Sequence, residues 1–548
     1  MPLEAVAAVF LLPSSSTILH VLLVLVMLLC LVKTHHRPWR KNRRCTPPLP
    51  PGPVPWPVVG NLPEMMVSDK PAFHWVHHIM KEKGTDIACI KLGGVHVIPI
   101  TCPKIALEVL KNQDANFASR PLTMASKTLS RSYRDAVMCP YGDQWKKMRR
   151  VLASEVVCPS RHRWLHDKRA DEADNLTRYV YNLAKSGSGV VDVRHIARHY
   201  CGNIVRRLVF NTRYFGKPQP DSGPGPLEVQ HVDAVFASLG LLYSFCVSDY
   251  LPWLLGLDLD GHEKMIKEAN EKVTRMHDTV IHERWRLWES GEMQEPQDLL
   301  DVLITLKDAD DDARPVLSIE EVKAQLMDIT FASMDNPSNA VEWALAEMVN
   351  SPEMLKKAVD EIDAVVGRER LVLESDIPRL NYVKACIREA FRLHPVAAFN
   401  VPHVALADTT VAGYHIPKGS HVILSRTGLG RNPDVWEDPL RFNPERHITV
   451  SVSSTPELEV EVEVSLAEQD LRFISFSTGR RGCIAAVLGT AMSIMLFGRL
   501  LQGFSWSKMA GVAAIDLSES RHNTFMARPL VLQAEPRLPA HLYPGISL

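Results

Sequence analysis

The sequence predicts a mainly α-helical protein with small peripheral β-sheets, carried behind an N-terminal membrane anchor. Three observations support this fold class. Helical patterns dominate from about Asn61 onward, and the β-like runs between them are short. An apolar segment, Ile18–Val32, lies near the N-terminus and is followed at once by a cluster of cations. Since no repeat or linker divides the remainder, we expect one large helical domain.

The composition excludes several classes of protein. The 548 residues carry a formal net charge of -1, which argues against a nucleic-acid partner. The hydrophobic fraction of 46% is ordinary for a large globular core. The 10 cysteines are scattered without paired spacing, which argues against a disulfide framework and for a reducing compartment.

Residues 1–33 are predicted to form a membrane signal anchor. Ile18–Val32 is apolar apart from His20, and with Ser14–Thr17 it approaches the roughly 20 residues that a span needs. A cleaved signal peptide carries cations before its apolar run, whereas only Glu4 precedes this one. The cations that follow are Lys33, Arg37, Arg40, Lys41, Arg43 and Arg44. This asymmetry places the rest of the chain on the cytoplasmic side; a cleaved signal and a buried helix are the alternatives.

A basic and proline-rich hinge is predicted at residues 34–60, before a globular body at 61–548. The run Pro47–Pro57 favours stiff polyproline II over helix. Its position suits an arm that orients the body on the membrane. A disordered linker and a ligand for a proline-binding domain are the alternatives.

Short strands are expected within the body. Residues 87–100 alternate in polarity around Gly93-Gly94, which predicts a hairpin. Thr410–Ala412 and His421–Leu424 are further β-like runs. Because these runs are so short, we expect them to form small sheets beside a helical core.

The segment Phe476–Ala485 carries the clearest chemical signal. It reads Phe-x-x-Gly-x-Arg-x-Cys. Gly479 permits a turn that a Cβ would strain, and Arg481 offers a cation to an anionic group. Cys483 precedes an apolar run predicted to begin a helix, and helix N-termini stabilise thiolates. The pattern is typical of a loop that holds a thiolate against haem iron; the alternative is a buried structural cysteine.

Two other places offer hydrogen-bond donors for the carboxylates of a haem. Trp145 and Arg149 lie one helical turn apart, so the indole and the guanidinium share a face. His403 follows Pro402 and is a candidate donor to the second propionate. The alternatives are an amphipathic surface helix for the first pair and a polar loop residue for His403.

An ion-pair network is predicted near the thiolate loop. Glu389 and Arg392 are three residues apart and share a helix face. Arg446, in the run Phe442–Arg446, supplies a second arginine shortly before the cysteine loop. An exposed pair would contribute little, so we expect this network to be buried and to hold the loop in place.

The segment 320–350 is helical in composition except for Pro337. A proline removes one helical hydrogen bond and clashes with the carbonyl four residues back, here that of Ser333, at a cost of about 3 kcal/mol. We therefore expect a broken turn beside Asp335 and Asn336 that forms a polar notch for water, dioxygen or proton transfer. The alternative is that residues 335–338 end one helix and cap another.

In their order and spacing, these motifs resemble a plant microsomal cytochrome P-450 over essentially the whole chain. Two details are typical of a smaller group within this superfamily. The loop closes with Ala485 where most of the superfamily has glycine, and Asn336-Pro337 replaces the usual threonine pair of the oxygen-activating helix. With residues 476–486 and Asn400–His403, they are similar to the plant amino-acid N-hydroxylases that form aldoximes, particularly the tyrosine-hydroxylating members of cereals.

The resemblance implies a cytochrome P-450 fold and a haem b group whose iron is ligated by Cys483. The residues expected at the haem are Arg481, Trp145, Arg149, His403 and Phe476. It further implies that the amino nitrogen of an aromatic L-amino acid, tyrosine first, is hydroxylated twice. Loss of CO2 and water then gives the aldoxime, as in cyanogenic glucoside or defence aldoxime synthesis.

The same resemblance implies partners and a location. A membrane-bound reductase is expected to deliver electrons from NADPH. The chain is expected in the endoplasmic reticulum membrane through a single-pass anchor, with its catalytic domain facing the cytosol. Downstream pathway enzymes are further candidate partners.

The resemblance also implies residues for proton delivery and for substrate binding. Asp335 is expected to deliver protons with a water held near Ser333 or Asn336. Arg134, or else Arg131, is expected to bind the substrate carboxylate, because the family's topology places this region over the haem. The alternative for both arginines is a solvated surface loop. The candidates for the ring pocket are Phe399, Asn400 and Phe525.

Three rival functions remain open at this point. Phenylalanine or tryptophan could replace tyrosine as the substrate. A reductase-independent haem-thiolate dehydratase or isomerase is favoured by the missing threonine, but the cysteine loop has no insertion and the anchor suits a membrane-bound reductase. A non-catalytic haem sensor or electron carrier does not need so large a closed body.

Overall fold

The computed structural model describes residues 47–217, 219–307, 315–448, 463–521 and 523–545. The predicted anchor and residues 34–46 of the predicted hinge lie outside this part of the chain. Within it the fold is mainly helical, with short strands gathered into small sheets, as the sequence predicts.

The helices vary from single turns to one long central helix. The α-helices in the first half of the described chain are α2 (Leu62–Val67), α3 (Ala72–Glu82), α4 (Pro103–Leu107), α5 (Met124–Leu129), α6 (Asp143–Val151), α7 (Pro159–Trp164), α8 (His166–Lys185), α9 (Val193–Phe210), α10 (Pro226–Leu242), α11 (Val247–Tyr250) and α12 (His262–Glu289). Those in the second half are α13 (Leu299–Thr305), α14 (Ile319–Asn350), α15 (Pro352–Val365), α16 (Asn381–Leu393), α17 (Arg426–Gly430) and α18 (Ala486–Gly503). Short 3-10 and π turns are η1 (Glu108–Asn112), η2 (Leu152–Val156), η3 (Pro252–Leu254), η4 (Glu374–Arg379), η5 (Pro444–His447) and η6 (Ala540–Leu542).

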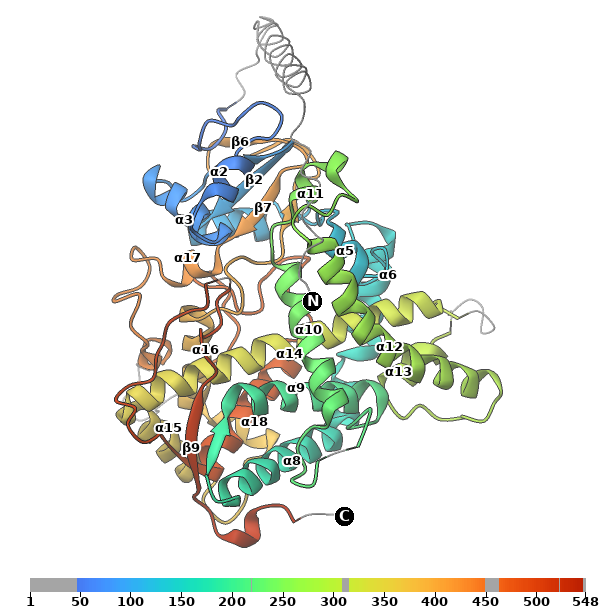
Figure 1. Ribbon diagram of the computed structural model, residues 1–548, viewed down its shortest axis with the longest axis vertical. Helices are drawn as coiled ribbons and strands as arrows, with labels where there is room; N and C mark the ends of the chain where they lie inside the picture. Colours follow the sequence, from blue (N-terminus) through green and yellow to red (C-terminus); the bar gives the residue numbers. More distant parts are fainter. Residues whose placement is uncertain (1–46, 218, 308–314, 449–462, 522, 546–548) are drawn as a thin grey trace, which may run out of the picture.

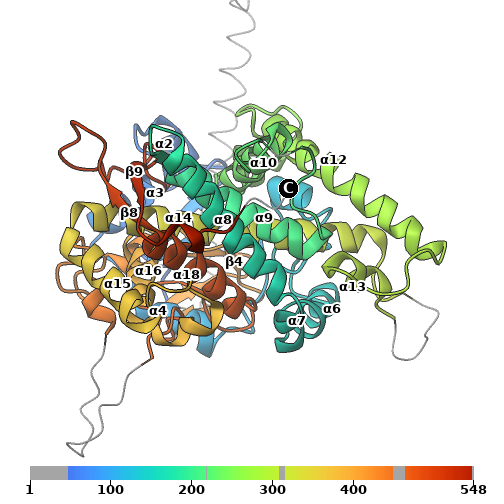
Figure 2. The same ribbon diagram turned by 90° about the horizontal axis from the view of Figure 1, so that it is seen from below.

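Helix α14 is the centre of the fold. It crosses the middle of the molecule in Figure 1 and packs against α9, α10, α16 and α18. The view from below shows α16 and α18 close together, with α8 and α9 crossing beside them (Figure 2), and α18 also packs against α8. Most of its residues are buried, which explains why its sequence is apolar on more than one face.

The sequence explains where α14 begins. Ser318 caps it: the hydroxyl accepts from the Glu321 N–H, and the Glu321 carboxylate accepts from the Ser318 N–H at 2.9 Å. The helix then continues past Pro337 to Asn350. The predicted broken turn and the alternative of two helices are therefore both wrong. Packing on several sides holds the helix continuous, and the Ser338 hydroxyl donates to the carbonyls of Met334 and Asp335 nearby.

The strands are β1 (Ile90–Leu92), β2 (Val95–Ile100), β3 (Val190–Asp192), β4 (His403–Val404), β5 (Thr409–Val411), β6 (Tyr414–Ile416), β7 (His421–Leu424), β8 (Phe504–Ser507) and β9 (Val531–Pro536). The largest sheet has the order β1-β2-β7-β4, with β2 and β7 parallel and the other pairs antiparallel. The order β3-β9-β8 forms a second sheet, and β5 pairs with β6. The hairpin predicted around Gly93-Gly94 is confirmed by β1 and β2, and β5 and β7 occupy the other two predicted runs.

The described end of the hinge is attached to the body by backbone hydrogen bonds. The Cys89 N–H donates to the Pro51 carbonyl at 2.9 Å, and the His415 N–H donates to Pro48 at 2.8 Å. Gly52 is needed here, because a Cβ would lie 1.8 Å from the Cys89 oxygen. This end of the proline-rich run is thus fixed against the large sheet.

Two helical segments in the described chain are long and apolar enough to cross a membrane. These are Pro226–Tyr250 and Ala486–Gly503, and 72% of the window in the second is buried inside the protein. Core helices of large domains share this composition, so neither is assigned as a span.

Candidate functional site

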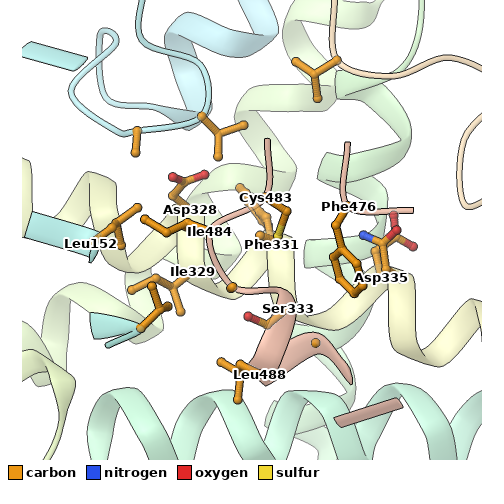
Figure 3. Close-up of a pocket in the computed structure, with 18 of the residues that line it drawn as sticks. Leu152, Asp328, Ile329, Phe331, Ser333, Asp335, Phe476, Cys483, Ile484 and Leu488 are labelled. Atoms are coloured by element: carbon orange, nitrogen blue, oxygen red, sulfur yellow. The ribbon is translucent and has the colours of Figure 1, made fainter. Parts of the chain in front are cut away.

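A cavity of about 320 Å³ lies beside α14 and the cysteine loop. Figure 3 shows Asp328, Ile329, Ser333 and Asp335 along α14, beside the loop that carries Phe476 and Cys483. Side chains from α6, α9, α10 and α18 complete the lining. The cavity is thus formed where these and other helices meet the loop that the sequence predicts to hold the ligand.

The cysteine loop is held in the tight turn that the sequence predicts. The Cys483 N–H donates to the Phe476 carbonyl at 2.7 Å. Gly479 has a φ of +72°, and a Cβ there would lie 2.1 Å from the Leu110 oxygen. The side chain of Phe476 packs edge-on against Phe391 and lines the cavity. These contacts leave Cys483 exposed to the cavity.

The thiol of Cys483 is poised for a metal. Burial raises its pKa, and the hydrogen bond from the Ala485 N–H and the charges of Arg149 and Arg426 act in the opposite direction. A metal that binds a thiol deprotonates it, so a bound haem iron would supply the thiolate form. Helix α18 begins at Ala486, so the cysteine lies just before its N-terminus, as predicted.

Four arginines line the cavity without an ion-pair partner among the described residues, and three of them donate to backbone carbonyls. Arg149 donates to the Gly482 carbonyl at 2.8 Å. Arg481 donates to backbone carbonyls, including Ala118 and Cys139 at 2.6 Å each, and its guanidinium lies over the Trp145 ring. Arg120 donates to the carbonyls of Val401 and Pro402, at 2.9 Å each.

This cluster of cations needs an anion. Burial lowers the pKa of Arg120, and the charge of Arg481 lowers it further. Burial likewise lowers the pKa of Arg481 to about 10, and Arg149 adds to the effect. Like charges gathered in a low-dielectric site repel each other unless an anion is bound among them. Two propionates of a haem would supply this charge.

The other predicted donors lie at the same cavity. Trp145, on α6, is buried and lines it. His403 is also buried, and its Nδ1 lies 2.7 Å from the Phe117 carbonyl. Because a carbonyl only accepts, Nδ1 carries the proton, and Nε2 of a neutral ring can only accept, so His403 is not the donor to a propionate that the sequence predicts. Burial keeps the pKa of His403 well below its usual range, so the ring is neutral.

Together these residues fit a haem. The sulfur of Cys483 faces the cavity, and arginines without an ion-pair partner and the Trp145 indole, a neutral donor, lie around it. A haem needs this combination of an axial ligand and partners for its carboxylates. The group itself would supply oxygen chemistry that no side chain here can perform.

The Glu389 network is present and buried. Arg392 donates to both carboxylate oxygens of Glu389, at 2.8 and 2.7 Å, and Arg446 donates at 3.0 Å. His447 adds a contact at 2.7 Å. Burial alone would raise the pKa of Glu389, but these hydrogen bonds outweigh it and lower the pKa to about 2. The carboxylate is therefore firmly ionised.

A second chain of contacts connects this network to the cysteine loop. The Arg388 guanidinium pairs with Glu468, and its Nε donates to His447 Nδ1 at 3.2 Å. The Glu468 N–H in turn donates to Ser475 Oγ at 3.1 Å, immediately before Phe476. The predicted support of the loop thus runs through Arg388 and Glu468, which have no motif of their own.

Helix α14 brings two aspartates to the cavity. Asp335 is 1% exposed, and neither of its carboxylate oxygens has a hydrogen-bond partner among the described residues. Burial raises its pKa to about 7, although Arg198 and Arg426 lower it in part. Asp328 lies two turns earlier, and burial raises its pKa to about 7 as well. The neighbouring Asp135 is also buried with a raised pKa, so these two carboxyl groups share their protons.

Comparison with known proteins identifies the architecture. The family model described as Cytochrome P450, written here cytochrome P-450, matches residues 50–533. This chain belongs to the cytochrome P-450 family. It is 70% identical to tyrosine N-monooxygenase of Sorghum bicolor, over 100% of both chains. It is 56% identical to tryptophan N-monooxygenase 1 of Arabidopsis thaliana, over 91% of this chain and 90% of the relative. It is 52% identical to valine N-monooxygenase 1 of Manihot esculenta, over 96% and 94%.

Membership of the family settles the cofactor class of this cytochrome P-450 as haem-thiolate iron, supplied with electrons by a redox partner. Cys483 is the cysteine that faces the cavity from the matching loop. The predicted helical body with a cytochrome P-450 fold is confirmed by the same match and by the observed helices, whereas the N-terminal anchor stays a prediction.

The two arginines predicted to bind the substrate carboxylate lie outside the cavity lining. Arg131 forms ion pairs with Asp278 and Glu320, and Arg134 is exposed. Neither lines the cavity. The left-handed backbone at residues 131–133 turns this segment outward, a feature that the sequence does not reveal.

Of the residues predicted for the ring pocket, Asn400 lines the cavity and the two phenylalanines do not. Phe399 contacts His77 near the large sheet, and Phe525 lies beside Phe236 in a separate small pocket. The apolar lining instead includes Leu208, Leu239, Leu242, Ile329 and Phe331. Ser333 and Asn336 line the cavity as expected.

Sequence reasoning missed several cavity residues. They are Arg120, Asp135, Tyr243, Asp328 and Arg426. None belongs to a short motif, and most lie in loops or at element ends. A charged residue in such a place is usually solvated, so only the folded chain shows that these face an enclosed space.

Proposed function

We propose that this cytochrome P-450 hydroxylates the amino nitrogen of an aromatic L-amino acid twice, with tyrosine as the first choice, and releases the aldoxime. The full-length 70% identity to a tyrosine N-monooxygenase carries the proposal. Relatives named for tryptophan and valine support the reaction class, so phenylalanine and tryptophan stay as alternative substrates. The product suits cyanogenic glucoside or defence aldoxime synthesis.

The chemistry balances with NADPH as the reductant. Each hydroxylation takes one dioxygen, two electrons and two protons; one oxygen atom enters the N–H bond and the other leaves as water. Loss of water and CO2 from the dihydroxylated amino acid then leaves the C=N–OH group of the aldoxime. A bound haem with its thiolate ligand supplies the oxygen chemistry.

The chain's own residues bind the haem and position the substrate. Cys483 supplies the thiolate, and Arg120, Arg149 and Arg481 bind the propionates. Trp145 would add a neutral donor, whereas the N–H of His403 is used by the Phe117 carbonyl. These residues would hold the haem in the cavity that α14 lines, and the substrate would bind in the same cavity.

Proton supply is proposed to involve α14. Asp335 can hold a proton at Oδ near neutral pH because burial raises its pKa to about 7. Ser333 and Asn336 lie on the same helix and can hold a water beside it. The coupling of NADPH use to aldoxime formation in Asn336→Ala tests this role, because unchanged coupling would exclude the Asn336 side chain.

The proposed location is the endoplasmic reticulum membrane, with residues 1–33 as a single-pass anchor, 34–60 as the hinge and 61–548 as the cytosolic catalytic body. Exposed apolar side chains support contact of this body with the bilayer. Near the hinge they are Val54, Trp56, Val58, Met66 and Val67, and near η3 they are Trp253, Leu255, Leu257 and Leu259. We call these side chains the apolar face.

The two halves of the apolar face lie at one end of the molecule. Leu62 and Leu251 belong to one buried cluster, against which Val59 and Leu254 pack. Figure 1 shows α2 and α11 at the same end. Exposed tryptophan and leucine gathered in this way are typical of a membrane-facing surface. This orientation suits a membrane-bound NADPH-dependent reductase as the redox partner, and enzymes of the same pathway as neighbours.

Reconstitution in membranes tests the proposal. The chain, a plant NADPH-dependent reductase and NADPH are combined with L-tyrosine, L-phenylalanine or L-tryptophan in separate reactions, and the products are identified by mass spectrometry. We expect the aldoxime of tyrosine. Turnover without NADPH would favour a dehydratase or isomerase, and no aldoxime from any of the three, despite a normal reduced carbon-monoxide spectrum, would refute the proposed reaction.

A further inference from the structure

The cavity holds an arginine that the haem-binding cluster does not explain. Arg426 begins α17, directly after strand β7, and its N–H donates to the Ala398 carbonyl at 2.8 Å. Its guanidinium forms no hydrogen bond or ion pair with any residue that the structure describes, and its buried Nε has no partner. Arginine in an enclosed site is normally paired, so an unpaired one that lines a cavity indicates a missing anion.

Asp335 is the matching acid. It lies on α14, lines the same cavity, and has two buried oxygens without a partner in the described chain. Arg426 and Asp335 feel each other's charge, and Tyr243 lies near both. Yet no ion pair joins them in the described residues. The cavity therefore contains a cation and an anion that face a common space without closing on each other.

Neither charge is accounted for by another partner. Arg198 is the other cation near Asp335, but its guanidinium lies 3.8 Å from the centre of the Phe236 ring and faces the separate small pocket. Among the haem-binding arginines, Arg149 also feels the charge of Cys483, whereas the charges acting on Arg481 come from Cys139, Asp135, Arg149 and Asp328. Those acting on Arg426 come from Tyr243, Asp335 and Cys483. Arg426 thus belongs to the α14 side of the cavity.

We propose that Arg426 and Asp335 form the head-group site for a zwitterionic α-amino acid, in which Arg426 binds the carboxylate and Asp335 accepts a hydrogen bond from the ammonium. This inference rests on the proposed function and names the contacts that select its substrate class. Both charges of the amino acid would then be paired inside a low-dielectric site, and both orphan side chains would be satisfied. The side chain of the substrate is left to the apolar lining.

The same pairing prepares the nitrogen for reaction. An ammonium has no lone pair and cannot be hydroxylated. Transfer of one proton from the ammonium nitrogen to Oδ of Asp335 leaves a neutral amine and a neutral carboxylic acid, with no other bond changed. Burial makes Asp335 more basic than an ordinary aspartate, which favours this transfer.

Three ligands separate the two contacts. L-Tyrosine has both charged groups, tyramine lacks the carboxylate, and 3-(4-hydroxyphenyl)propionate lacks the amine. Binding of each to the full-length haem-loaded protein in nanodiscs is measured by equilibrium dialysis. We compare the wild type with Arg426→Gln and Asp335→Asn. Arg134→Gln is the matched control, because Arg134 is exposed and outside the cavity.

We expect Arg426→Gln to weaken tyrosine and the propionate about 10- to 100-fold, the loss typical of a charged hydrogen bond, and to leave tyramine within about two-fold. Asp335→Asn should weaken tyrosine and tyramine but spare the propionate. Arg134→Gln should change none of them. Arg426→Lys should restore part of the tyrosine affinity, because it keeps the charge without the planar fork.

The outcomes distinguish this inference from the proposed function. If the wild type binds tyrosine but Arg426→Gln and Arg426→Lys both leave its affinity unchanged, or weaken all three ligands equally, the head-group site is wrong and the proposed function stands. If the wild type binds none of the amino acids tested by reconstitution and makes no aldoxime from them, the head-group site and the proposed function are both refuted. A haem spectrum equal to that of the wild type shows that each variant is folded.

Discussion

Replacing Glu389 by glutamine tests whether the buried network holds the fold together. The change keeps the shape of the side chain and removes its charge. Glu389 is fully buried and accepts hydrogen bonds from Arg392, Arg446, His447 and the Asn443 N–H. In Glu389→Gln one carboxylate oxygen becomes an NH2 group, which is a donor and faces the N–H donors of the arginines. Arg392, 0% exposed, keeps a buried charge without its anion.

Two routes give a similar magnitude. The pKa of Glu389 falls from 4.5 to about 2 in the folded state, which corresponds to about 3 kcal/mol of stability at neutral pH. Breaking one partner of a buried ion pair typically costs 3–5 kcal/mol, by a rough estimate from other proteins. We therefore expect Glu389→Gln to lower the free energy of unfolding by about 3 to 5 kcal/mol at pH 7.

Urea unfolding of the haem-loaded protein provides the assay, followed by tryptophan fluorescence and by the haem absorbance band. Asp360→Asn is the matched control: it removes the carboxylate from the exposed pair Lys356–Asp360, and we expect a loss below about 0.5 kcal/mol. Since a lowered carboxyl pKa contributes stability that is lost as pH falls through the folded value, the difference between wild type and Glu389→Gln should shrink between about pH 4.5 and 2. A loss under 1 kcal/mol at pH 7, or one independent of pH, would refute the reasoning.

Four further changes test the site and the apolar face. Cys483→Ser should abolish the thiolate-type reduced carbon-monoxide spectrum while helical circular dichroism is kept; an unchanged spectrum contradicts the ligation. Arg149→Gln should speed haem loss to apomyoglobin about 10-fold, because a charged hydrogen bond is lost, whereas the exposed neighbour Arg150→Gln should not. Asp335→Asn should raise the free energy of unfolding above pH 7. Burial raises the pKa of this carboxyl from 3.8 to about 7, so the wild type loses stability as the pH rises between these values, and the full cost of the buried carboxylate is present above pH 7. No gain over the wild type at pH 8 would argue against this account. Leu257→Asp, in a chain that lacks residues 1–46, should reduce flotation with phosphatidylcholine vesicles, and equal flotation rejects the apolar face as a membrane contact.

The local parts of the fold could be predicted because each depends on nearby residues. The hairpin at β1 and β2 follows from alternation around two glycines, and the start of α14 follows from Ser318 and Glu321. The fate of Pro337 could not be predicted in this way. A proline destabilises an isolated helix, but α14 is packed against other helices on several sides, and the burial of its neighbours outweighs the lost hydrogen bond.

The cysteine loop, the Glu389 pair and the Trp145 helix could be identified from sequence because each motif is short and its chemistry depends on fixed spacing. The sequence therefore determined the cofactor and the class of enzyme. It did not place Arg426 or Arg120, because their role depends on which distant segments surround them. Arg131 and Arg426 are the same residue type in irregular segments, yet the first is paired with Asp278 and Glu320 and the second lines the cavity unpaired. Only tertiary structure decides between these outcomes, since the partners available to a charged side chain, and the water it loses, are set by packing between helices far apart in the chain.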